Sequence, residues 1–314
     1  MTFKNHKPAI STGAQIHALV PLALLFAVIL FGLALGTGAV RAADAKTLRF
    51  APLPMQNPET VMKQVRPLLA HLERELGLEI EVVYSTDYAD MLALFRAGDV
   101  DMAYLGPLPY MALRDQYPDA EPLVRFREAS GATTYTCSVV GWSLDALPDL
   151  SDSAGQTVAL TQPLSTCGYL STSAMLRQAG TDIETTWYGY LGAHDKVALS
   201  VIRGEHHLGG LKTAIARKYE HLGLIALAET GPLPSFALTA NRATMPFTLM
   251  QQVVTVLTAM EPEGRDQALM ADWGDNVRNG AVAARDSDYD TLRSMGGWQD
   301  IPPHGNHEDG IQTP

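Results

Sequence analysis

The chain has 314 residues, of which 46% are hydrophobic, and its formal net charge is −11. A chain of this length and apolar content can bury one large core or two medium ones, and its excess of acidic residues argues against a nucleic-acid partner. It contains only two cysteines, which excludes a small domain stabilised mainly by disulfides.

The N-terminal segment has the pattern of a secretory signal peptide. Two lysines precede an apolar run over residues 18–40, and Val40-Arg41-Ala42 offers the small residues that a signal peptidase recognises. The run is also long enough for an uncleaved membrane anchor, but its proline and glycines favour cleavage. Removing residues 1–42 takes away three basic residues and no acidic one, so the net charge falls from −11 to −14. We therefore expect an exported protein.

Strand and helix patterns alternate in the first half of the remaining chain. Val61, Val65 and Leu68 lie on one stripe of a helix that Gly77 ends. The expected elements are a strand at 47–53, a helix at 58–77, a strand at 79–85, a helix at 86–98 and a strand at 99–107. This βαβαβ order with short connections predicts a mainly parallel sheet flanked by helices.

The second half repeats the alternation with different content. The expected elements are strands at 136–142 and 157–162, a loop and helix at 165–180, a helix at 194–204, strands at 224–229 and 236–241, and a helix at 245–260. Two α/β lobes follow if the chain crosses near Tyr135 and returns near Phe236. The predicted domains are lobe 1 at 43–134 and 236–301, lobe 2 at 135–235, and a polar, disordered tail at 302–314.

Three segments place neutral hydrogen-bond donors at the carboxyl ends of strands, where helices begin. They are residues 85–88, 104–110 and 164–169. Ligands of open α/β sheets bind at such positions, and helix N-termini favour anions. Any one of these segments could be an ordinary helix cap, but their recurrence predicts a site for a small oxyanion.

Two stretches of the sequence resemble a known family. Residues 49–110 and 148–180 are similar to the phosphate-, phosphite- and phosphonate-binding proteins of ABC transporters, and the similarity in order of elements covers about residues 47–243. The resemblance implies a two-lobed periplasmic-binding-protein fold of type II, with the ligand in the cleft between the lobes. It also implies a location in the periplasm, and we expect neither a cofactor nor a bound metal.

The resemblance also indicates ligand residues. The family's Ser-Thr-Ser-Gly anion loop, its Asp-Tyr helix start and its Ser-His-Asp helix start are matched by residues 165–168, 87–88 and 193–195. We add Tyr190 because aromatic residues at lobe edges can close over a ligand, although most simply pack. The candidate residues from these segments are Tyr88, Ser165, Thr166, Cys167, Gly168, Tyr190 and His194.

One position departs from the family pattern. Where the family reads Gly-x-x-Asp-Ala-Gly, this chain reads GEHHLGG, and His207 stands in the place of an aspartate that reaches the ligand. A titratable donor or acceptor thus replaces a carboxylate. We therefore include His207 among the candidate ligand residues and expect ligands that carry an ammonium group to be disfavoured.

The two cysteines leave alternatives open. Cys137 and Cys167 could form a structural disulfide, or they could be free thiols that contact a soft ligand. One branch of the family resembles sensors of arsenic oxyanions that are paired with membrane histidine kinases, and free thiols would suit that branch. A cysteine-dependent enzyme that uses Cys167 with His194 as its base is a third reading, but no orienting group is evident.

The predicted function is therefore that of a solute-binding protein, not an enzyme. It captures a small oxyanion, either arsenite or arsenate, or phosphite, phosphate or a phosphonate. It presents this ligand to an inner-membrane ABC permease or to a histidine-kinase sensor. The alternative reading is an uptake receptor for phosphonate or phosphite with a structural Cys137–Cys167 disulfide. We expect a monomer in either case.

Overall fold

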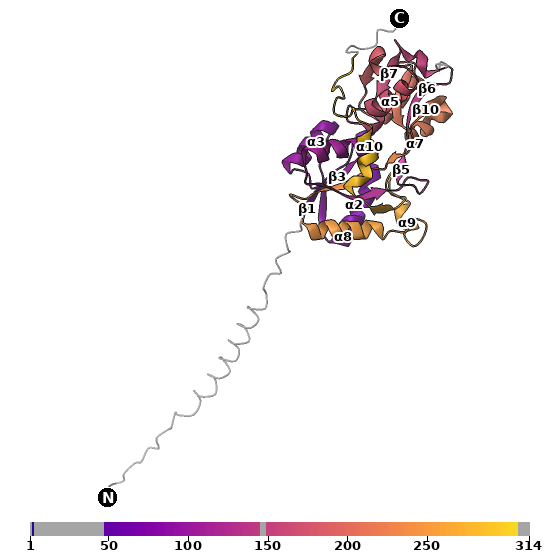
Figure 1. The fold of residues 1–314 in the computed structure, drawn as a ribbon. Coiled ribbons are helices and arrows are strands. Elements are labelled where there is room, and N and C mark those ends of the chain that lie inside the picture. Colours follow the sequence, from indigo (N-terminus) through magenta and orange to yellow (C-terminus); the bar gives the residue numbers. More distant parts are fainter. Residues whose placement is uncertain (1, 3–46, 145–148, 307–314) are drawn as a thin grey trace. The chain divides into compact units, whose positions relative to one another are not determined.

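The computed structural model describes residues 2, 47–144 and 149–306. The predicted signal peptide lies outside these residues except for residue 2. All described residues from 47 onward belong to one compact unit, which contains two main sheets joined by a short ribbon (Figure 1). Among the helices of the described part, none is long and apolar enough to cross a membrane.

The first sheet has six strands in the order β13-β4-β12-β3-β1-β2. Its strands are β1 (Thr47–Ala51), β2 (Glu79–Val82), β3 (Met102–Leu105), β4 (Ala120–Phe126), β12 (Ala237–Asn241) and β13 (Ala281–Ala283). Strand β1 pairs in parallel with β2 and β3, whereas β12 is antiparallel to β3 and β4. The helices in this half of the fold are α2 (Pro58–Leu76), α3 (Tyr88–Ala97), α4 (Pro107–Gln116), α8 (Phe247–Thr258), α9 (Gln267–Met270) and α10 (Asp290–Ser294).

The second sheet has five strands in the order β10-β6-β9-β7-β8. Its strands are β6 (Cys137–Trp142), β7 (Thr157–Leu160), β8 (Trp187–Tyr190), β9 (Leu208–Lys212) and β10 (Leu224–Glu229). Strand β7 pairs in parallel with β8 and β9, and β6 is antiparallel to β9 and β10. The helices of this half are α5 (Ser171–Gln178), α6 (His194–Ile202) and α7 (Thr213–Ala216).

Both sheets share one topology. In each, a βαβαβ unit supplies three parallel strands, and the strand that follows a chain crossing is inserted antiparallel beside them, as β12 in the first sheet and β6 in the second. The crossings pair with each other as a ribbon of β5 (Thr134–Tyr135) and β11 (Leu233–Pro234). This is the two-lobed fold that the sequence predicts. The predicted lobe boundaries at residues 135 and 236 fall in or beside the ribbon and stay a prediction.

Helix α2 shows why the strand-helix alternation was readable. Asn57 accepts the Thr60 N–H at 2.9 Å, and Pro58 occupies the first helical position, where its missing N–H costs nothing. Gly77 ends the helix at φ 64°, a conformation that favours glycine. The apolar stripe, including Val61 and Leu68, is buried against the core. The predicted helix at 58–77 is therefore confirmed.

The C-terminal segment is ordered further than the sequence predicts. Asn306 accepts the Tyr188 N–H and donates to the Thr186 carbonyl, both at 2.9 Å, and the Tyr190 hydroxyl donates to the Pro302 carbonyl at 2.9 Å. Strand β8 is an edge strand, and an asparagine amide can satisfy both the N–H and the C=O that such an edge leaves unpaired. The prediction of a disordered tail is therefore wrong for residues 302–306, and residues 307–314 lie outside the described part.

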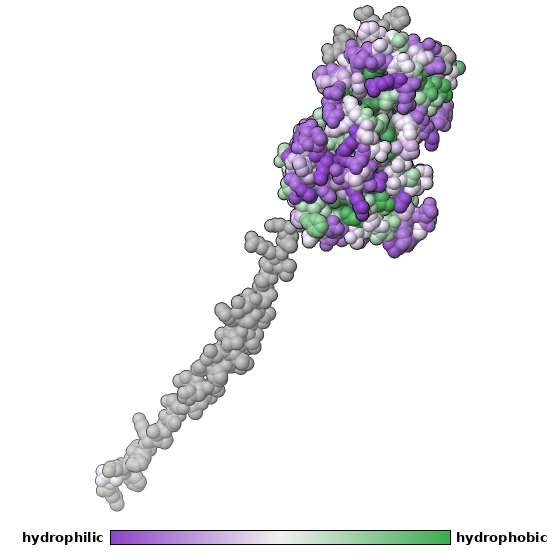
Figure 2. Space-filling model, viewed as in Figure 1, coloured by the Kyte–Doolittle hydropathy of each residue, from purple (hydrophilic) through white to green (hydrophobic). Residues whose placement is uncertain are grey.

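The visible surface of the described residues is mainly hydrophilic, with separate apolar patches (Figure 2). One patch lies over α8, whose first residue, Phe247, is 68% exposed. The same helix buries Leu249, Met250 and Val253. Helix α8 is therefore an amphipathic surface helix that packs one face on the first sheet.

Candidate ligand site between the two sheets

A narrow cavity lies where loops that follow strands of both sheets meet. Its volume is about 10 Å³, which is room for about one water molecule. The lining combines hydroxyl, imidazole and backbone groups with aromatic and apolar side chains. The residues that line it are Leu53, Tyr88, Gly106, Pro109, Tyr135, Ser165, Thr166, Cys167, His194 and Phe236. This position is the predicted ligand cleft.

Three helices point their N-termini at this region, and the first turn of each donates across the gap between the sheets. In α3, the Tyr88 N–H donates to Gln162 Oε1 at 2.8 Å, and in α4 the Leu108 N–H donates to Thr166 Oγ1 at 3.0 Å. In α6, the His194 N–H donates to a backbone carbonyl that follows β1, at 3.0 Å. First-turn N–H groups have no partner within their own helix, so these are three donors whose acceptors come from the opposite lobe.

Gln162 is a site residue that the sequence reading missed. It is 4% exposed and lies two residues beyond the end of β7. Its Nε2 donates to the Gly192 carbonyl at 2.9 Å, and its Oε1 accepts the Tyr88 N–H. Its amide therefore ties together loops from both lobes. The available signal was a polar side chain at the end of an otherwise apolar strand.

The anion loop forms a single wide turn, Thr166–Leu170, before α5 begins. Thr166 and Cys167 are buried, and the Gly168 N–H donates to the Ser165 carbonyl at 3.1 Å. A Cβ on Gly168 would lie 3.0 Å from the Gln162 carbonyl oxygen, so glycine is required for the loop to approach the end of β7. Gly168 is a predicted ligand residue, but its N–H already donates to a carbonyl of the same loop.

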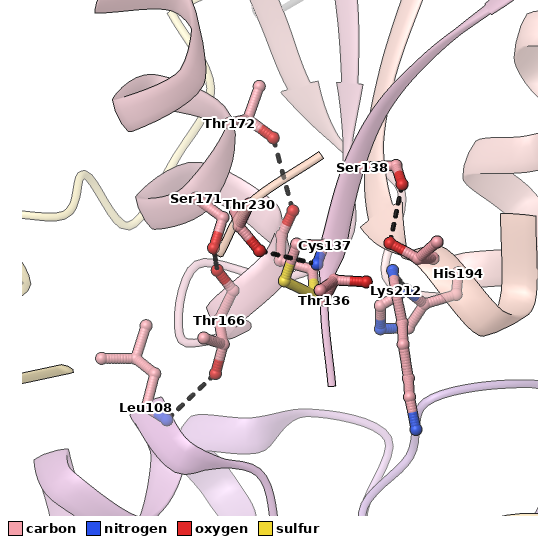
Figure 3. Close-up of a disulfide and its surroundings, with 12 residues drawn as sticks. Leu108, Thr136, Cys137, Ser138, Thr166, Ser171, Thr172, His194, Lys212 and Thr230 are labelled. Atoms are coloured by element: carbon pink, nitrogen blue, oxygen red, sulfur yellow. Dashed lines mark hydrogen bonds between the residues drawn. A yellow bond between two sulfur atoms is a disulfide. The ribbon is translucent and has the colours of Figure 1, made fainter. Parts of the chain in front are cut away.

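The two cysteines form a disulfide with a Cα–Cα distance of 5.1 Å (Figure 3). Cys137 is 0% exposed and Cys167 is 2% exposed, and neither is free. The disulfide alternative is therefore confirmed. The prediction that free thiols contact an arsenic ligand is wrong, because both sulfur atoms are already bonded. The reading of Cys167 as an enzymatic nucleophile is wrong for the same reason.

His194 is held as a neutral donor. Its Nδ1 accepts the backbone N–H of Lys212 at 3.1 Å, which leaves the imidazole proton on Nε2. Burial lowers the pKa of His194 to about 3, with a smaller contribution from the nearby charge of Lys212. The imidazole therefore lines the cavity as an uncharged group at neutral pH.

Lys212 is the second residue that the sequence reading missed. It ends β9 and is 1% exposed, and its ammonium group donates to Glu128 Oε1 at 2.7 Å and to Asn276 Oδ1 at 3.1 Å. The ammonium lies 5.2 Å from the ring centroid of Tyr135 and 5.0 Å from that of Phe236. Burial lowers its pKa, and Glu128 opposes this shift. Glu128 follows β4, so the ion pair joins the two lobes.

Figure 3 shows how these groups lie around the disulfide. The side chain of Thr166 extends from the second lobe toward Leu108, and that of Lys212 extends on the other side of the disulfide toward its partners in the first lobe, Glu128 and Asn276. His194 lies beside the backbone of Lys212. The disulfide thus sits between two side chains that reach across the gap.

Four predicted ligand residues do not line the cavity: Gly168 and Cys137 adjoin Cys167 without lining it, and His207 and Tyr190 lie farther away. The His207 N–H donates to the Thr157 carbonyl at 3.1 Å and its Nδ1 lies 2.8 Å from Thr157 Oγ1, so it sits at the amino end of β7, whereas the cavity is beyond the carboxyl end. The Tyr190 hydroxyl donates a hydrogen bond to the Pro302 carbonyl oxygen. Neither residue lines the site in this structure. Tyr88, Ser165, Thr166, Cys167 and His194 do come together, and their role as ligand residues stays a prediction.

The family model described as "ABC transporter, phosphonate, periplasmic substrate-binding protein" matches residues 50–289. The chain belongs to this family. The description names substrate-binding components of a transporter, and it gives no support to an arsenic-sensing branch or to a kinase partner.

Curated relatives of this family member match over part of their length. The chain is 29% identical over 174 residues to the phosphate-import protein PhnD of Mycolicibacterium smegmatis, which covers 52% of this chain and 54% of the relative. It is 25% identical over 129 residues to the phosphonates-binding periplasmic protein of Escherichia coli, which covers 40% and 38%. The chain thus spans about half or less of the curated relatives it matches.

Solved structures of similar fold cover more of the chain. PhnD1 from Prochlorococcus marinus, in complex with methylphosphonate, has a TM-score of 0.72 at 16% identity and covers 82% of this chain and 100% of that chain. A binding-protein component of an ABC phosphonate transporter from Pseudomonas aeruginosa has a TM-score of 0.70 at 17% identity, covering 80% and 86%. These likenesses confirm the two-lobed periplasmic-binding-protein fold.

Proposed function

We propose that this chain is the solute-binding component of an ABC importer for a small tetrahedral oxyanion of the phosphonate, phosphite or phosphate class. Family membership supports the transporter role. The relatives named for phosphate import and for phosphonate binding support the ligand class. The ligand lies between the two lobes, and the partner that receives it is a membrane permease.

One observation carries this proposal. Tyr88, Leu108 and His194 each direct a first-turn N–H across the gap at an oxygen of the opposite lobe. All three acceptor oxygens are uncharged, as amide, hydroxyl and carbonyl groups. An oxyanion would offer charged oxygens to the same donors, and hydrogen bonds to charged acceptors at helix N-termini are the stronger ones. The site can therefore exchange internal neutral acceptors for those of an anion.

The size of the cavity requires the lobes to move before the ligand enters. A volume of about 10 Å³ holds about one water molecule, so a phosphonate cannot enter this closed form. Separating the lobes breaks the bonds from Tyr88 and Leu108 and frees both donors. Binding then follows a hinge mechanism, in which the ligand shifts the population between open and closed forms.

Calorimetry on the mature protein tests this proposal. The panel is phosphate, phosphite, methylphosphonate and methanesulfonate, the last being a monoanion of similar shape. Once an anion has taken the Leu108 N–H, the Thr166 hydroxyl is free to donate to that anion. Replacing Thr166 by valine exchanges this hydroxyl for a methyl group, and we expect binding to weaken roughly 10- to 100-fold, as for loss of a hydrogen bond to a charged group. Ser173→Ala is the matched control, because Ser173 lies on α5 and is bonded to Arg177 outside the cavity.

The outcome of this experiment distinguishes an oxyanion-binding protein from an enzyme. Binding of a phosphorus oxyanion that Thr166→Val weakens and Ser173→Ala does not would support the proposal. Silence from all four compounds would contradict it. Recovery of a chemically altered ligand after incubation would instead indicate an enzyme.

A further inference from the structure

We propose that Lys212 selects the charge of the ligand's substituent: the site rejects oxyanions that carry an ammonium group and accepts those whose substituent is uncharged. This inference rests on the proposed function and goes beyond it, because it names which phosphonates the site takes.

The Lys212 ammonium stands behind the aromatic wall of the site. Tyr135 and Phe236 both line the cavity, and the ammonium lies 5.2 Å and 5.0 Å from their ring centroids. The backbone N–H of Lys212 is fixed by His194, which also lines the cavity. The ammonium therefore contacts two residues of the cavity wall, and its charge acts on a ligand in the cavity through a medium of low dielectric constant.

The receptor that a ligand ammonium would need is already occupied. Aromatic faces and a carboxylate are the groups that bind ammonium ions, and here Tyr135, Phe236 and Glu128 all contact Lys212. None of the described residues that line the cavity is acidic. A ligand ammonium therefore finds no carboxylate on the cavity wall, and two of the aromatic rings that it would meet already contact a like charge.

The size of this effect can be bounded. Two like charges about 7 Å apart, at an effective dielectric constant near 20, disfavour binding roughly 50-fold. The opposite charge of Glu128 reduces this repulsion. We therefore expect the protein to prefer an alkylphosphonate over its amino derivative by about 10-fold.

The test compares two ligands that differ only in the ammonium group, ethylphosphonate and 2-aminoethylphosphonate. Calorimetry gives the ratio of their dissociation constants for three proteins. The wild type should favour ethylphosphonate. Lys212→Met with Glu128→Gln removes both charges, so the ratio should move to within about threefold of one. Lys212→Ala vacates the aromatic and carboxylate receptor, so the ratio should reverse, and 2-aminoethylphosphonate should raise the melting temperature more than ethylphosphonate does.

The outcomes distinguish this inference from the proposed function. If Lys212→Ala does not fold, the doubly neutral variant still decides the question. A wild type that binds both phosphonates equally, or a ratio that is the same in all three proteins, would overturn the role of Lys212 and leave the proposed function intact. Failure of the wild type to bind any phosphorus oxyanion would overturn both. If the Lys212–Glu128 ion pair were purely structural, the variants would change the stability of the protein and leave the ratio of the two dissociation constants unchanged.

Discussion

The disulfide ties the anion loop to the strand that leaves the hinge ribbon, and its removal should cost a calculable amount of stability. Cys137 is the first residue of β6, directly beyond β5, and Cys167 lies in the cavity wall. The perturbation is the double substitution Cys137→Ala with Cys167→Ala. Alanine is preferred to serine because both sites are buried and a hydroxyl there would lack a partner.

The magnitude follows from the length of chain that the bond closes. The two cysteines are 30 residues apart in sequence, and in the chain-entropy model closing such a loop lowers the free energy of the folded state relative to the unfolded one by about 3.6 kcal/mol. The pairing of β6 with β9 and β10 is made by backbone hydrogen bonds, which do not require the disulfide. We therefore expect the double variant to fold with a free energy of unfolding lower by roughly 3–4 kcal/mol.

Urea unfolding of the oxidised protein, the reduced protein and the double variant measures this. Reductant should lower the stability of the wild type and leave the double variant unchanged, which separates loss of the bond from loss of the two sulfur atoms. A double variant within about 1 kcal/mol of the oxidised wild type would refute the loop-closure reasoning. Unchanged wild-type stability after complete reduction would refute it independently.

Two further predictions concern single residues of the site. The His194 pKa of about 3 lies below its value in the unfolded chain, so the unfolded chain takes up the proton first and the free energy of unfolding falls as the pH drops from about 6.5 toward 3. His194→Gln should remove roughly 3 kcal/mol of the stability that is lost between pH 7 and pH 4, as measured by urea unfolding at each pH. A variant with the same pH dependence as the wild type would contradict this. A Cβ on Gly210 would lie 2.9 Å from the Cys167 carbonyl oxygen and would clash with Thr172. Gly210→Ala should therefore lower the free energy of unfolding by roughly 1–3 kcal/mol. Gly231→Ala is the control and should leave the stability unchanged, because its Cβ would meet nothing within 4 Å.

The fold was predictable where local signals agreed with tertiary packing. Helix α2 has an N-cap, an apolar stripe and a terminal glycine in the expected places, and the first three strands of the first sheet follow the predicted βαβαβ order. Strand β9 was missed because its sequence, LGGLK, reads as a loop. The structure gives the reason: a Cβ on Gly209 would lie 2.7 Å from a methyl group of Val197. Glycine is there to let α6 approach a central strand, which no local pattern reveals.

Strands β4 and β8 were missed for other reasons. Strand β4 contains Pro122, which is normally unfavourable within a sheet, at a position where the register with β12 shifts. Strand β8 is four residues long and mainly aromatic, and its outer edge is completed by Asn306 from the end of the chain. Both strands depend on partners far away in sequence, so periodicity alone could not identify them.

The candidate site was predictable to the extent that it is built from helix starts. Segments 85–88 and 164–169 were identified because helix N-termini carry recognisable sequences, whereas His194 came only from the family resemblance; the cavity brings Tyr88, Ser165, Thr166 and His194 together. His207 was misplaced because a family pattern located the segment but not which end of β9 faces the cleft. Contacts across the lobes, such as that of Lys212 with Glu128, require both lobes to be folded and closed, and nothing local to either residue indicates the other.

The same cross-lobe contacts suggest how such a site can be selective without a formal charge on its wall. In the closed form, the donors of Tyr88 and Leu108 are satisfied by the neutral oxygens of Gln162 and Thr166. A neutral solute that displaced these oxygens would replace one neutral hydrogen bond by another and would gain little binding free energy. An oxyanion gains about 1 kcal/mol or more at each exchange, because hydrogen bonds to charged acceptors are worth more than neutral ones. The internal acceptors therefore set a threshold that a neutral solute does not cross and an oxyanion does.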